Sequence, residues 1–322
     1  MAIGLILVDG QWQDYTEDLD KTQGQFIRHD SVFRNWIQAD PNAEFPAQPG
    51  RYHLYISLAC PWAHRALIFL KLKKLENLIS YSIVNPIMGE KSWHFSSDNE
   101  DCSDPLNGFQ FLFENYLLSE PNYTGYVTVP VLWDKETNKI VNNESSEIVR
   151  MLNSAFDAYT DVKTDYYPKI LRAEIDSINS EIYKNINNGV YRCGFAKTQT
   201  AYESAFDALF SLLDKLEQRL SSQRYLCGAS VTEADWRLFT TLVRFDAVYF
   251  GHFKTNLKRI IDYTNLWNYL KDLYQLEGIS ETVNMVHIKN HYYRSHQEIN
   301  PTGIVPKGPE LNFLQPHDRD RF

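Results

Sequence analysis

One cysteine at a strand-to-helix junction constrains this chain more than any other feature. Residues 52–56 alternate and are rich in β-formers, which predicts a strand, and residues 66–74 predict a helix with a buried face. Pro61 suits the first helical position, because its missing N–H costs nothing there. Cys60 is therefore predicted at a helix N-terminus, where unpaired N–H groups and the helix dipole favour a thiolate.

This cysteine has no partner in its own turn. A dithiol oxidoreductase would carry a second cysteine three residues on, where this chain has Ala63. Cys60 can form a mixed disulfide with another thiol but has no adjacent resolving cysteine. The alternative is a small buried hydrophobic residue. The agreement of strand, Cys-Pro pair and helix favours the reactive role.

Composition narrows the functional class. The chain has 322 residues, 43% of them hydrophobic, which is enough for two domains with cores of their own. A net charge of −9 argues against a nucleic-acid partner. No stretch has the length or apolar character of a membrane span or a convincing signal peptide, so we expect no membrane partner. The four cysteines show no zinc or disulfide spacing, which favours a reducing cytoplasm; they are Cys60, Cys102, Cys193 and Cys227.

The first half predicts a mixed α/β layer after a polar, irregular extension over residues 1–50. Within residues 51–160 the pattern predicts strand, helix, strand, helix, two strands and a helix. A long polar insertion over residues 85–106 contains Trp93. Beyond the Cys60 junction, the expected strands are 79–84, 127–134 and 139–142, and the expected helices are 109–116 and one that begins at Ser145 as its N-cap.

The second half predicts an all-α domain over residues 166–298. Apolar residues recur there at helical spacing. Thr232 and Asp235 fit a capping box at a helix start, and the proline-containing tail over residues 299–322 is not expected to be helical. The three apolar runs are Ile170, Ile175, Ile178 and Ile182; Phe206, Leu209, Phe210, Leu213, Leu216 and Leu220; and Leu266, Tyr269, Leu270 and Leu273.

Two further positions fit a ligand site. Val129-Pro130 interrupts a strand pattern, which fits either a cis bond at a turn beside a ligand or a proline on an edge strand. Glu144-Ser145 at a helix start can bind a carboxylate through free N–H groups and a hydroxyl, or can be a plain cap.

Together these features resemble the thioredoxin-fold glutathione transferases. The narrower resemblance, which spans nearly the whole chain, is to the glutathionyl-hydroquinone reductases, the Xi class of that superfamily. It implies a thioredoxin-like N-terminal domain followed by an all-helical C-terminal domain. The broader resemblance rests on residues 60–63, 129–130, 144–145 and 232–235. The narrower one rests on residues 60–65, 188–191, 244–254, 287–296 and 300–303.

The resemblance also implies roles for individual residues. Cys60 is the nucleophile, Trp93 contacts glutathione from the insertion, and Tyr126, Val127, Thr128 and Val129 form a backbone cradle. Glu144 and Ser145 take the γ-glutamyl end, and Tyr191, Tyr249 and Tyr292 surround the second substrate. The family often has arginine where this chain has Tyr126, so a cationic contact to a glutathione carboxylate is expected to be missing, with more effect on affinity than on chemistry.

The implied activity is the glutathione-dependent reduction of glutathionyl-hydroquinones through a Cys60–glutathione disulfide, in a cytoplasmic homodimer. Tyr191 would protonate the leaving ring carbon, a role suited to a phenolic hydroxyl. Two alternatives stay open at this point. One is an Omega-like thioltransferase or dehydroascorbate reductase, and the other is a non-catalytic ligand carrier with the same fold.

A metal site is not expected. His287 and His291 lie four residues apart on a predicted helix, a spacing that can chelate zinc. No glutamate follows His287 as in a zincin, and the sequence offers no clear third ligand.

Overall fold

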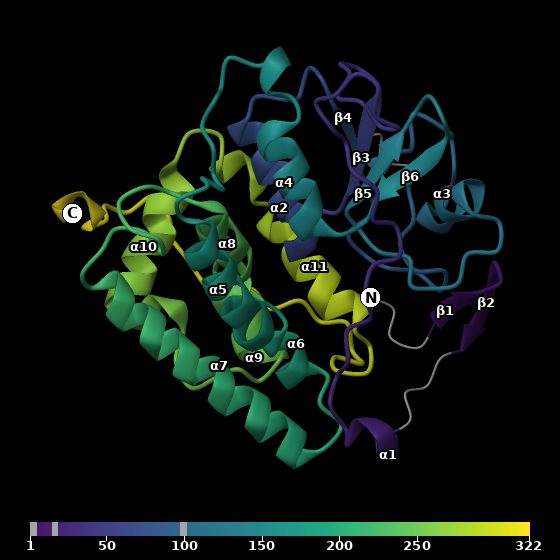
Figure 1. The fold of residues 1–322 in the computed structure, drawn as a ribbon. Coiled ribbons are helices and arrows are strands. Elements are labelled where there is room, and N and C mark those ends of the chain that lie inside the picture. Colours follow the sequence, from purple (N-terminus) through teal and green to yellow (C-terminus); the bar gives the residue numbers. More distant parts are fainter. Residues whose placement is uncertain (1–4, 15–18, 97–101) are drawn as a thin grey trace. The chain divides into compact units, whose positions relative to one another are not determined.

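The computed structural model describes residues 5–14, 19–96 and 102–322 (Figure 1). The chain forms two compact units. The first, here called the sheet unit, comprises Met1–Thr16, His29–Thr164 and Thr282–His296. The second, the helical unit, comprises Glu17–Arg28, Asp165–Glu281 and Gln297–Phe322.

The sheet unit is built on a four-stranded mixed sheet. Its strand order is β4-β3-β5-β6, with β3 parallel to β4 and antiparallel to β5, and β5 antiparallel to β6. The element order confirms the predicted α/β layer. In chain order these elements are β3 (Tyr52–Ile56), α2 (Pro61–Leu72), β4 (Ser80–Ile83), α3 (Leu112–Ser119), β5 (Val131–Asp134), β6 (Lys139–Asn142) and α4 (Ser145–Ser154).

Helix α2 is the core of this unit. It lies beside α4 against the sheet (Figure 1), and its residues from Ala63 to Leu70 are all buried. Even His64 and Arg65 are only 1% exposed. The helix is therefore enclosed on nearly every side, whereas the sequence predicted that only one face would be buried. The reason is that it lies among the sheet, α4 and the chain around Thr282.

Helix α3 begins three residues later than predicted. The Glu114 carboxylate accepts hydrogen bonds from the backbone N–H of Phe111 at 2.8 Å and of Gln110 at 3.0 Å. This side-chain capping fixes the first turn after Phe111. Residues 109–111 instead pair with the insertion, where Phe95 N–H donates to the Gln110 carbonyl at 2.8 Å.

Strand β5 is shorter than predicted, because residues 127–130 are not part of it. The Thr128 backbone pairs with the Tyr116 hydroxyl and not with a neighbouring strand: its N–H donates to that hydroxyl at 3.1 Å, and its carbonyl accepts from it at 2.8 Å. Pro130 has no N–H to donate to a ladder. The Val129-Pro130 bond is cis, which agrees with the turn and not with the edge-strand alternative.

The predicted irregular extension contains regular structure. Strands β1 (Leu5–Val8) and β2 (Gln11–Asp14) form an antiparallel hairpin, and α1 spans Leu19–Thr22. Asp9 and Gly10 both have positive φ, which a two-residue hairpin turn requires. The prediction that no signal peptide begins the chain concerns residues 1–9, of which 1–4 lie outside the described part.

The helical unit confirms the predicted all-α domain. In the box at the start of α8, the Asp235 carboxylate accepts from the Thr232 backbone N–H at 2.7 Å, as expected. Ile170 was wrongly placed in a helical run: α5 begins only after Leu171, and Ile170 is 91% exposed. The main helices are α5 (Arg172–Ile182), α6 (Gly189–Gly194), α7 (Gln199–Leu220), α8 (Glu233–Arg244), α9 (Phe250–His252) and α10 (Thr264–Gln275).

Two boundaries differ from the predicted domains. Residues 17–28 of the extension group with the helical unit, whereas α11 (Met285–Ser295) groups with the sheet unit. The reason for the second difference is a set of polar contacts that sequence spacing cannot show. His64 Nε2 lies 2.7 Å from Thr282 Oγ1, and the Ser295 hydroxyl accepts from Met88 N–H at 2.9 Å.

The tail is largely extended, as predicted, but ends in a short 3₁₀ turn at Arg319–Arg321. The buried Arg319 guanidinium donates to the carbonyls of Leu220 and Arg224, both at 2.8 Å. These bonds satisfy carbonyl groups at and beyond the end of α7, which helix geometry leaves without partners. The turn is thus stabilised by Arg319 and not by local helix propensity.

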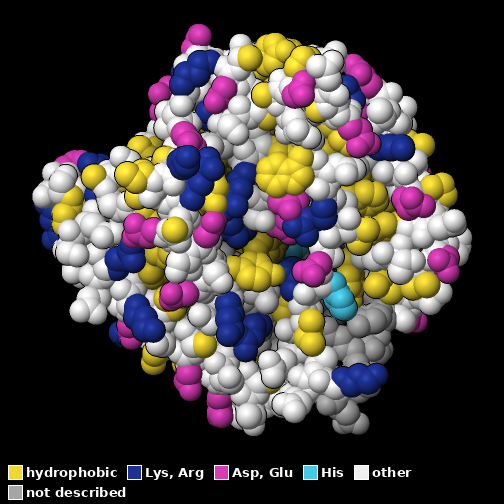
Figure 2. Space-filling view, viewed as in Figure 1, with side chains coloured by type: hydrophobic (Ala, Val, Ile, Leu, Met, Phe, Trp, Pro, Cys, Tyr) yellow, Lys and Arg dark blue, Asp and Glu magenta, His cyan; other side chains and the backbone are white. Residues whose placement is uncertain are grey.

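The surface carries both signs of charge. On the face shown in Figure 2, Lys and Arg side chains are interspersed with Asp and Glu. Among the described residues, none of the helices has the length and hydropathy needed to cross a bilayer.

Buried His53 should make stability depend on pH. Its ring nitrogens lie 2.7 and 2.9 Å from the hydroxyls of Ser80 and Ser82, and burial lowers its pKa from 6.5 to about 3. The unfolded chain therefore binds the proton first as pH falls below 6.5. Stability is fully present above that pH and falls by about 1.4 kcal/mol per pH unit toward pH 3. In urea titrations, the free energy of unfolding of the wild type should fall by about 2 kcal/mol more between pH 7 and pH 5 than that of His53→Gln. An equal fall in both proteins would contradict the prediction.

Candidate functional site

Cys60 lies where the sequence predicted it. It is the N-cap of α2, with Pro61 at the first helical position, and its carbonyl accepts the first helical bond from His64 N–H at 3.0 Å. Its side chain does not cap the helix. The Sγ–H instead donates to the Val129 carbonyl at 3.7 Å. The sulfur therefore lies both at the helix N-terminus and against the turn that precedes Pro130.

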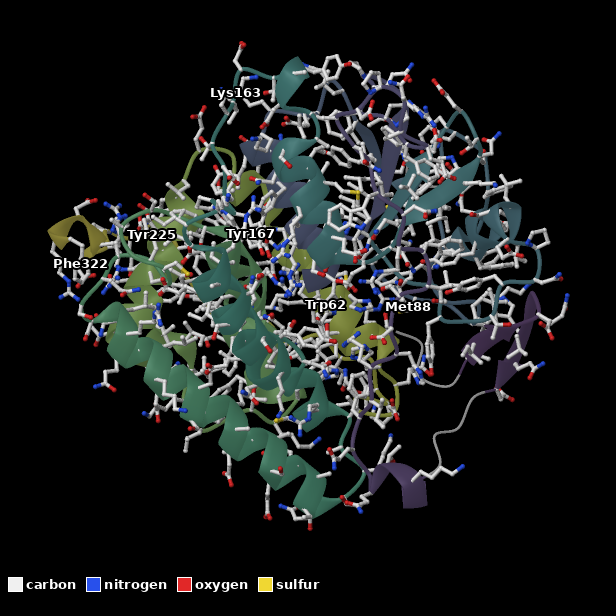
Figure 3. All side chains as sticks on the ribbon, in the orientation of Figure 1. Trp62, Met88, Lys163, Tyr167, Tyr225 and Phe322 are labelled. Atoms are coloured by element: carbon white, nitrogen blue, oxygen red, sulfur yellow. The ribbon has the colours of Figure 1, made fainter. Side chains whose placement is uncertain are left out.

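The residues after Cys60 connect it to α4. Trp62, labelled in Figure 3, lies on α2, and the Arg65 guanidinium lies 4.5 Å from the centre of its ring. Arg65 also donates to the Ser145 hydroxyl at 3.4 Å. Because Arg65 is only 1% exposed, its charge acts in a poorly solvated region near the start of α4. This cation is a feature that the sequence analysis did not identify.

The segment beside Cys60 is oriented by Tyr116. The Tyr116 hydroxyl donates to the Thr128 carbonyl and accepts from the Thr128 N–H. Polar groups of successive residues in an extended chain point to opposite sides. With Thr128 turned toward Tyr116, Val129 turns the other way, and its carbonyl meets the Cys60 sulfur. Val129 is therefore the cradle residue with its backbone at the cysteine, whereas Thr128 holds the segment.

Asn143 extends this arrangement to the start of α4. Its amide Nδ2 donates to the Tyr116 hydroxyl at 3.2 Å, and its Oδ1 accepts from Phe33 N–H at 3.1 Å. Tyr116 therefore uses its single donor and both of its lone pairs. Burial raises the pKa of Tyr116, which keeps this hydroxyl protonated. A buried polar network thus links the Thr128 segment to the residue before Glu144.

Glu144, and not Ser145, is the N-cap of α4. Its carboxylate accepts from the Ser146 backbone N–H at 2.9 Å, and the other oxygen accepts from the Ser31 hydroxyl at 3.3 Å. The predicted cap was therefore wrong by one residue, because the longer glutamate side chain reaches back over the first turn. Ser145 is the first helical residue, and its hydroxyl faces Arg65.

The rings of Trp93 and Tyr292 both contact that of His291. The Trp93 and His291 rings stack at 4.9 Å with an interplanar angle of 18°, and the Tyr292 ring lies 5.1 Å from His291, nearly perpendicular to it. Trp93 is only 3% exposed. His291 Nδ1 lies 2.9 Å from the Pro86 carbonyl, which ties α11 to the insertion. The position of the indole is thus set by a histidine far away in sequence.

Tyr126 lies next to an exposed histidine. The ring centres of Tyr126 and His29 are 5.2 Å apart, and the Tyr126 carbonyl accepts from the Tyr123 hydroxyl at 2.9 Å. The backbone groups of Tyr126 and Thr128 are thus engaged by the Tyr123 and Tyr116 hydroxyls. Val127 and Val129 alternate with these two residues along the segment. Val127 is 3% and Val129 4% exposed.

Tyr191 and Tyr249 belong to the helical unit and lie together there, with ring centres 6.1 Å apart. Both are positioned by π-helical turns. The segment Tyr183–Asn187 precedes α6, which carries Tyr191, and Phe245–Tyr249 ends at Tyr249 itself. Such turns rotate the following residues relative to a regular helix and often occur at functional sites. The rings of Phe26, Phe195 and Phe253 also pack around Tyr191.

The remaining cysteines differ from Cys60 in their surroundings. Burial raises the pKa of Cys193 to about 12 and that of Cys227 to about 11. Neither is poised as a nucleophile at neutral pH. In the part of the chain that the structure describes, His, Cys, Asp and Glu side chains form no group of three or more that could hold a metal ion.

Comparison with known proteins identifies the family. Residues 59–155 match the model of the glutathione S-transferase N-terminal domain, and residues 199–272 match that of the C-terminal domain. The chain is 52% identical to the glutathionyl-hydroquinone reductase YqjG of Escherichia coli over 321 residues, which cover 98% of each protein.

Solved structures give the same result. A Xi-class glutathione transferase from Natrialba magadii superposes with a TM-score of 0.93 at 47% identity, covering 99% of this chain and 97% of that one. The glutathione-bound structure of Escherichia coli YqjG superposes with a TM-score of 0.90 at 50% identity, covering 98% of this chain and all of that one. The chain therefore belongs to the glutathione S-transferase family and, within it, to the Xi-class glutathionyl-hydroquinone reductases.

Proposed function

We propose that this protein reduces glutathionyl-hydroquinones to hydroquinones with glutathione as the reductant, and that Cys60 is its nucleophile. The observation that carries the proposal is the position of the Cys60 sulfur, at the N-terminus of α2 and 3.7 Å from the Val129 carbonyl. The full-length similarity to a glutathionyl-hydroquinone reductase supports the substrate class.

The reaction proceeds in two steps. The Cys60 thiolate attacks the sulfur of the glutathionyl-hydroquinone, and the bond between that sulfur and the ring carbon breaks. The ring carbon takes the electron pair of this bond and a proton from Tyr191, so hydroquinone leaves and a Cys60–glutathione disulfide remains. A second glutathione thiolate attacks the glutathione sulfur of that disulfide, which releases oxidised glutathione and restores the Cys60 thiolate.

Glutathione would bind along the sheet unit. Val127 and Val129 offer backbone groups to the tripeptide in the way that an added strand pairs with an edge. The N–H groups at the start of α4, the Ser145 hydroxyl and the Arg65 charge suit a carboxylate, while the Glu144 carboxylate suits the γ-glutamyl ammonium. Trp93 would contact the tripeptide from the insertion, and Tyr126 and Thr128 would complete the cradle.

The three tyrosines would form the second-substrate site. Aromatic walls suit the stacking of a planar ring, and phenolic hydroxyls can donate protons to it. We assign the proton transfer to Tyr191, and ring contact and thiolate stabilisation to Tyr249 and Tyr292. We also propose a cytoplasmic homodimer. All four cysteines are buried as thiols, which supports a reducing compartment.

The direct test incubates the purified protein with a glutathionyl-hydroquinone and glutathione. Free hydroquinone and oxidised glutathione should appear in equal amounts. Turnover of a small mixed disulfide of glutathione without release of hydroquinone would favour an Omega-like thioltransferase. Binding of glutathione without turnover of either substrate would favour a ligand carrier.

Replacing Cys60 by serine should abolish turnover and leave the fold intact. A serine hydroxyl has far too high a pKa to ionise at neutral pH, so the helix N-terminus cannot activate it. The measurement is steady-state turnover together with thermal unfolding. Cys193→Ser is the matched control and should keep most of the activity. Activity close to wild type in Cys60→Ser would refute the assigned nucleophile.

Tyr191→Phe should distinguish the release of hydroquinone from simple thiol–disulfide exchange. It keeps the ring and its packing but removes the proton, and general acid catalysis contributes about 10²–10⁴-fold. We expect kcat/KM for glutathionyl-hydroquinone to fall at least about ten-fold, and that for a small glutathione mixed disulfide to change little, since a thiolate leaves without protonation. Equal losses on both substrates would show that Tyr191 acts on the cysteine or on binding instead.

Tyr116→Phe should weaken glutathione binding without changing the chemical step. It removes the hydroxyl that orients Thr128 and takes away the acceptor of the Thr128 N–H, so we expect KM for glutathione to rise about ten-fold with kcat nearly unchanged. Tyr52→Phe is the control, because the Tyr52 hydroxyl also donates to a partly buried backbone carbonyl, that of Pro46, at 2.8 Å. Both variants should lose about 1 kcal/mol of stability. An unchanged KM in Tyr116→Phe would count against the assigned role.

A further inference from the structure

A short N-terminal segment is attached to the junction between α6, which carries Tyr191, and α7. The Gly24 carbonyl accepts from Lys197 N–H at 2.9 Å, and the Thr198 hydroxyl donates to the Gln23 carbonyl at 3.2 Å. Gly24 has φ +75°, and a Cβ placed there would lie 2.6 Å from Thr198 Cγ2. The close approach at Gly24 thus fixes residues 23–28 against the junction of α6 and α7.

This segment delivers Arg28 to Tyr191. The Arg28 guanidinium carbon lies 4.7 Å from the centre of the Tyr191 ring and 5.3 Å from that of Phe26. Its Nε–H donates to Asn188 Oδ1 at 2.9 Å. Asn188 is the residue immediately before α6, so the same helix start positions both the cation and the tyrosine. All four residues belong to the helical unit.

A cation over this ring changes what the hydroxyl can do. When a phenol gives up its proton, negative charge spreads into the ring, and a guanidinium on the ring face stabilises that charge. The guanidinium stays charged at every accessible pH. It is also held in place by its bond to Asn188, so no rearrangement is needed when the phenolate forms.

We infer that Arg28 is a positioning residue that makes Tyr191 a stronger proton donor to the leaving ring carbon. The inference rests on the proposed function. As the carbon–sulfur bond breaks, the ring carbon takes its electron pair and the Tyr191 proton, and Arg28 stabilises the resulting phenolate. The second glutathione must lose its thiol proton before it attacks the Cys60 disulfide, and that proton restores the Tyr191 hydroxyl.

Other titratable groups around α6 do not offer the same effect. Burial lowers the pKa of His252 to about 4, so it is neutral at pH 7, and its ring packs on Phe253. The Asp246 carboxylate accepts from the N–H groups of Ile260 and Ile261. The titratable and charged groups on α6 and the elements packed around it include Arg192 and Cys193 on α6, Tyr202 and Glu203 on α7, Tyr183 and Lys184 on the turn Tyr183–Asn187, Asp246 and Tyr249 on the turn Phe245–Tyr249, and His252 on α9.

The experiment is a single turnover of reduced enzyme with excess glutathionyl-hydroquinone, without added glutathione, followed from pH 6 to pH 10 by release of hydroquinone. Removing the cation in Arg28→Gln should slow release at pH 7 by about three- to ten-fold, because the donor is weaker. The pH at which the rate of release falls, because the donor has ionised, should be about one pH unit higher in Arg28→Gln than in the wild type. Arg28→Lys keeps the charge, so its release rate and its pH profile should lie between those of the wild type and those of Arg28→Gln.

Three controls keep the test specific. Arg172→Gln removes a matched cation, which lies 4.9 Å from the ring of Tyr167 (labelled in Figure 3), and should leave rate and profile unchanged. Turnover of a small glutathione mixed disulfide should not change in Arg28→Gln. If that variant does not fold, Asn188→Ala, which removes only the tether of Arg28, should shift the profile in the same direction by a smaller amount.

The outcomes separate this inference from the proposed function. Absence of hydroquinone release by the wild-type enzyme would overturn the function itself. Normal release by the wild type with an identical pH profile in Arg28→Gln would overturn only the role of Arg28. Equal losses on both substrates in that variant would also overturn it, since a structural role predicts such a result.

Discussion

A single buried hydroxyl, that of Tyr116, sets the geometry on which the cysteine site depends. It satisfies both backbone groups of Thr128 and receives the amide of Asn143, so one atom joins α3, the turn before Pro130 and the approach to α4. A polar group buried without partners costs about 1–3 kcal/mol, which makes such a fully used network resistant to small shifts. Because Tyr116 binds both backbone groups of Thr128, the carbonyl of the next residue, Val129, points to the Cys60 sulfur.

The second constraint is the burial of α2. His64, one helical turn after Cys60, lies 2.7 Å from the Thr282 hydroxyl, at the end of the segment that leads into α11. The helix that begins at Cys60 is therefore tied to the chain that carries Tyr292 and to His291, which stacks on Trp93. A nucleophile at a helix N-terminus needs the helix to stay fixed, since the field of the dipole falls off within one turn.

Local patterns predicted those parts of the site that are made locally. Cys60-Pro61 marks its own helix start, and Thr232 and Asp235 form the expected box, because the residues that decide each structure are neighbours in sequence. Tyr116, Arg65 and Arg28 escaped prediction, since each acts on a partner 12 to 163 positions away. Ser145 was one residue from the true cap because serine has the higher general preference, whereas here the longer Glu144 side chain closes the turn.

The two chemical demands of the proposed reaction are met by different physical means. A thiolate is favoured by backbone N–H groups, which any helix start supplies and which need no particular neighbour. A proton donor to carbon must be strong yet still protonated near neutral pH, and no local motif provides that. We propose Tyr191 as that donor: π-helical turns lie next to it and to Tyr249, and residues 23–28 bring a cation to its ring. In this proposal the N-terminal extension of the chain contributes to the protonation step through Arg28, while the start of α2 contributes the thiolate.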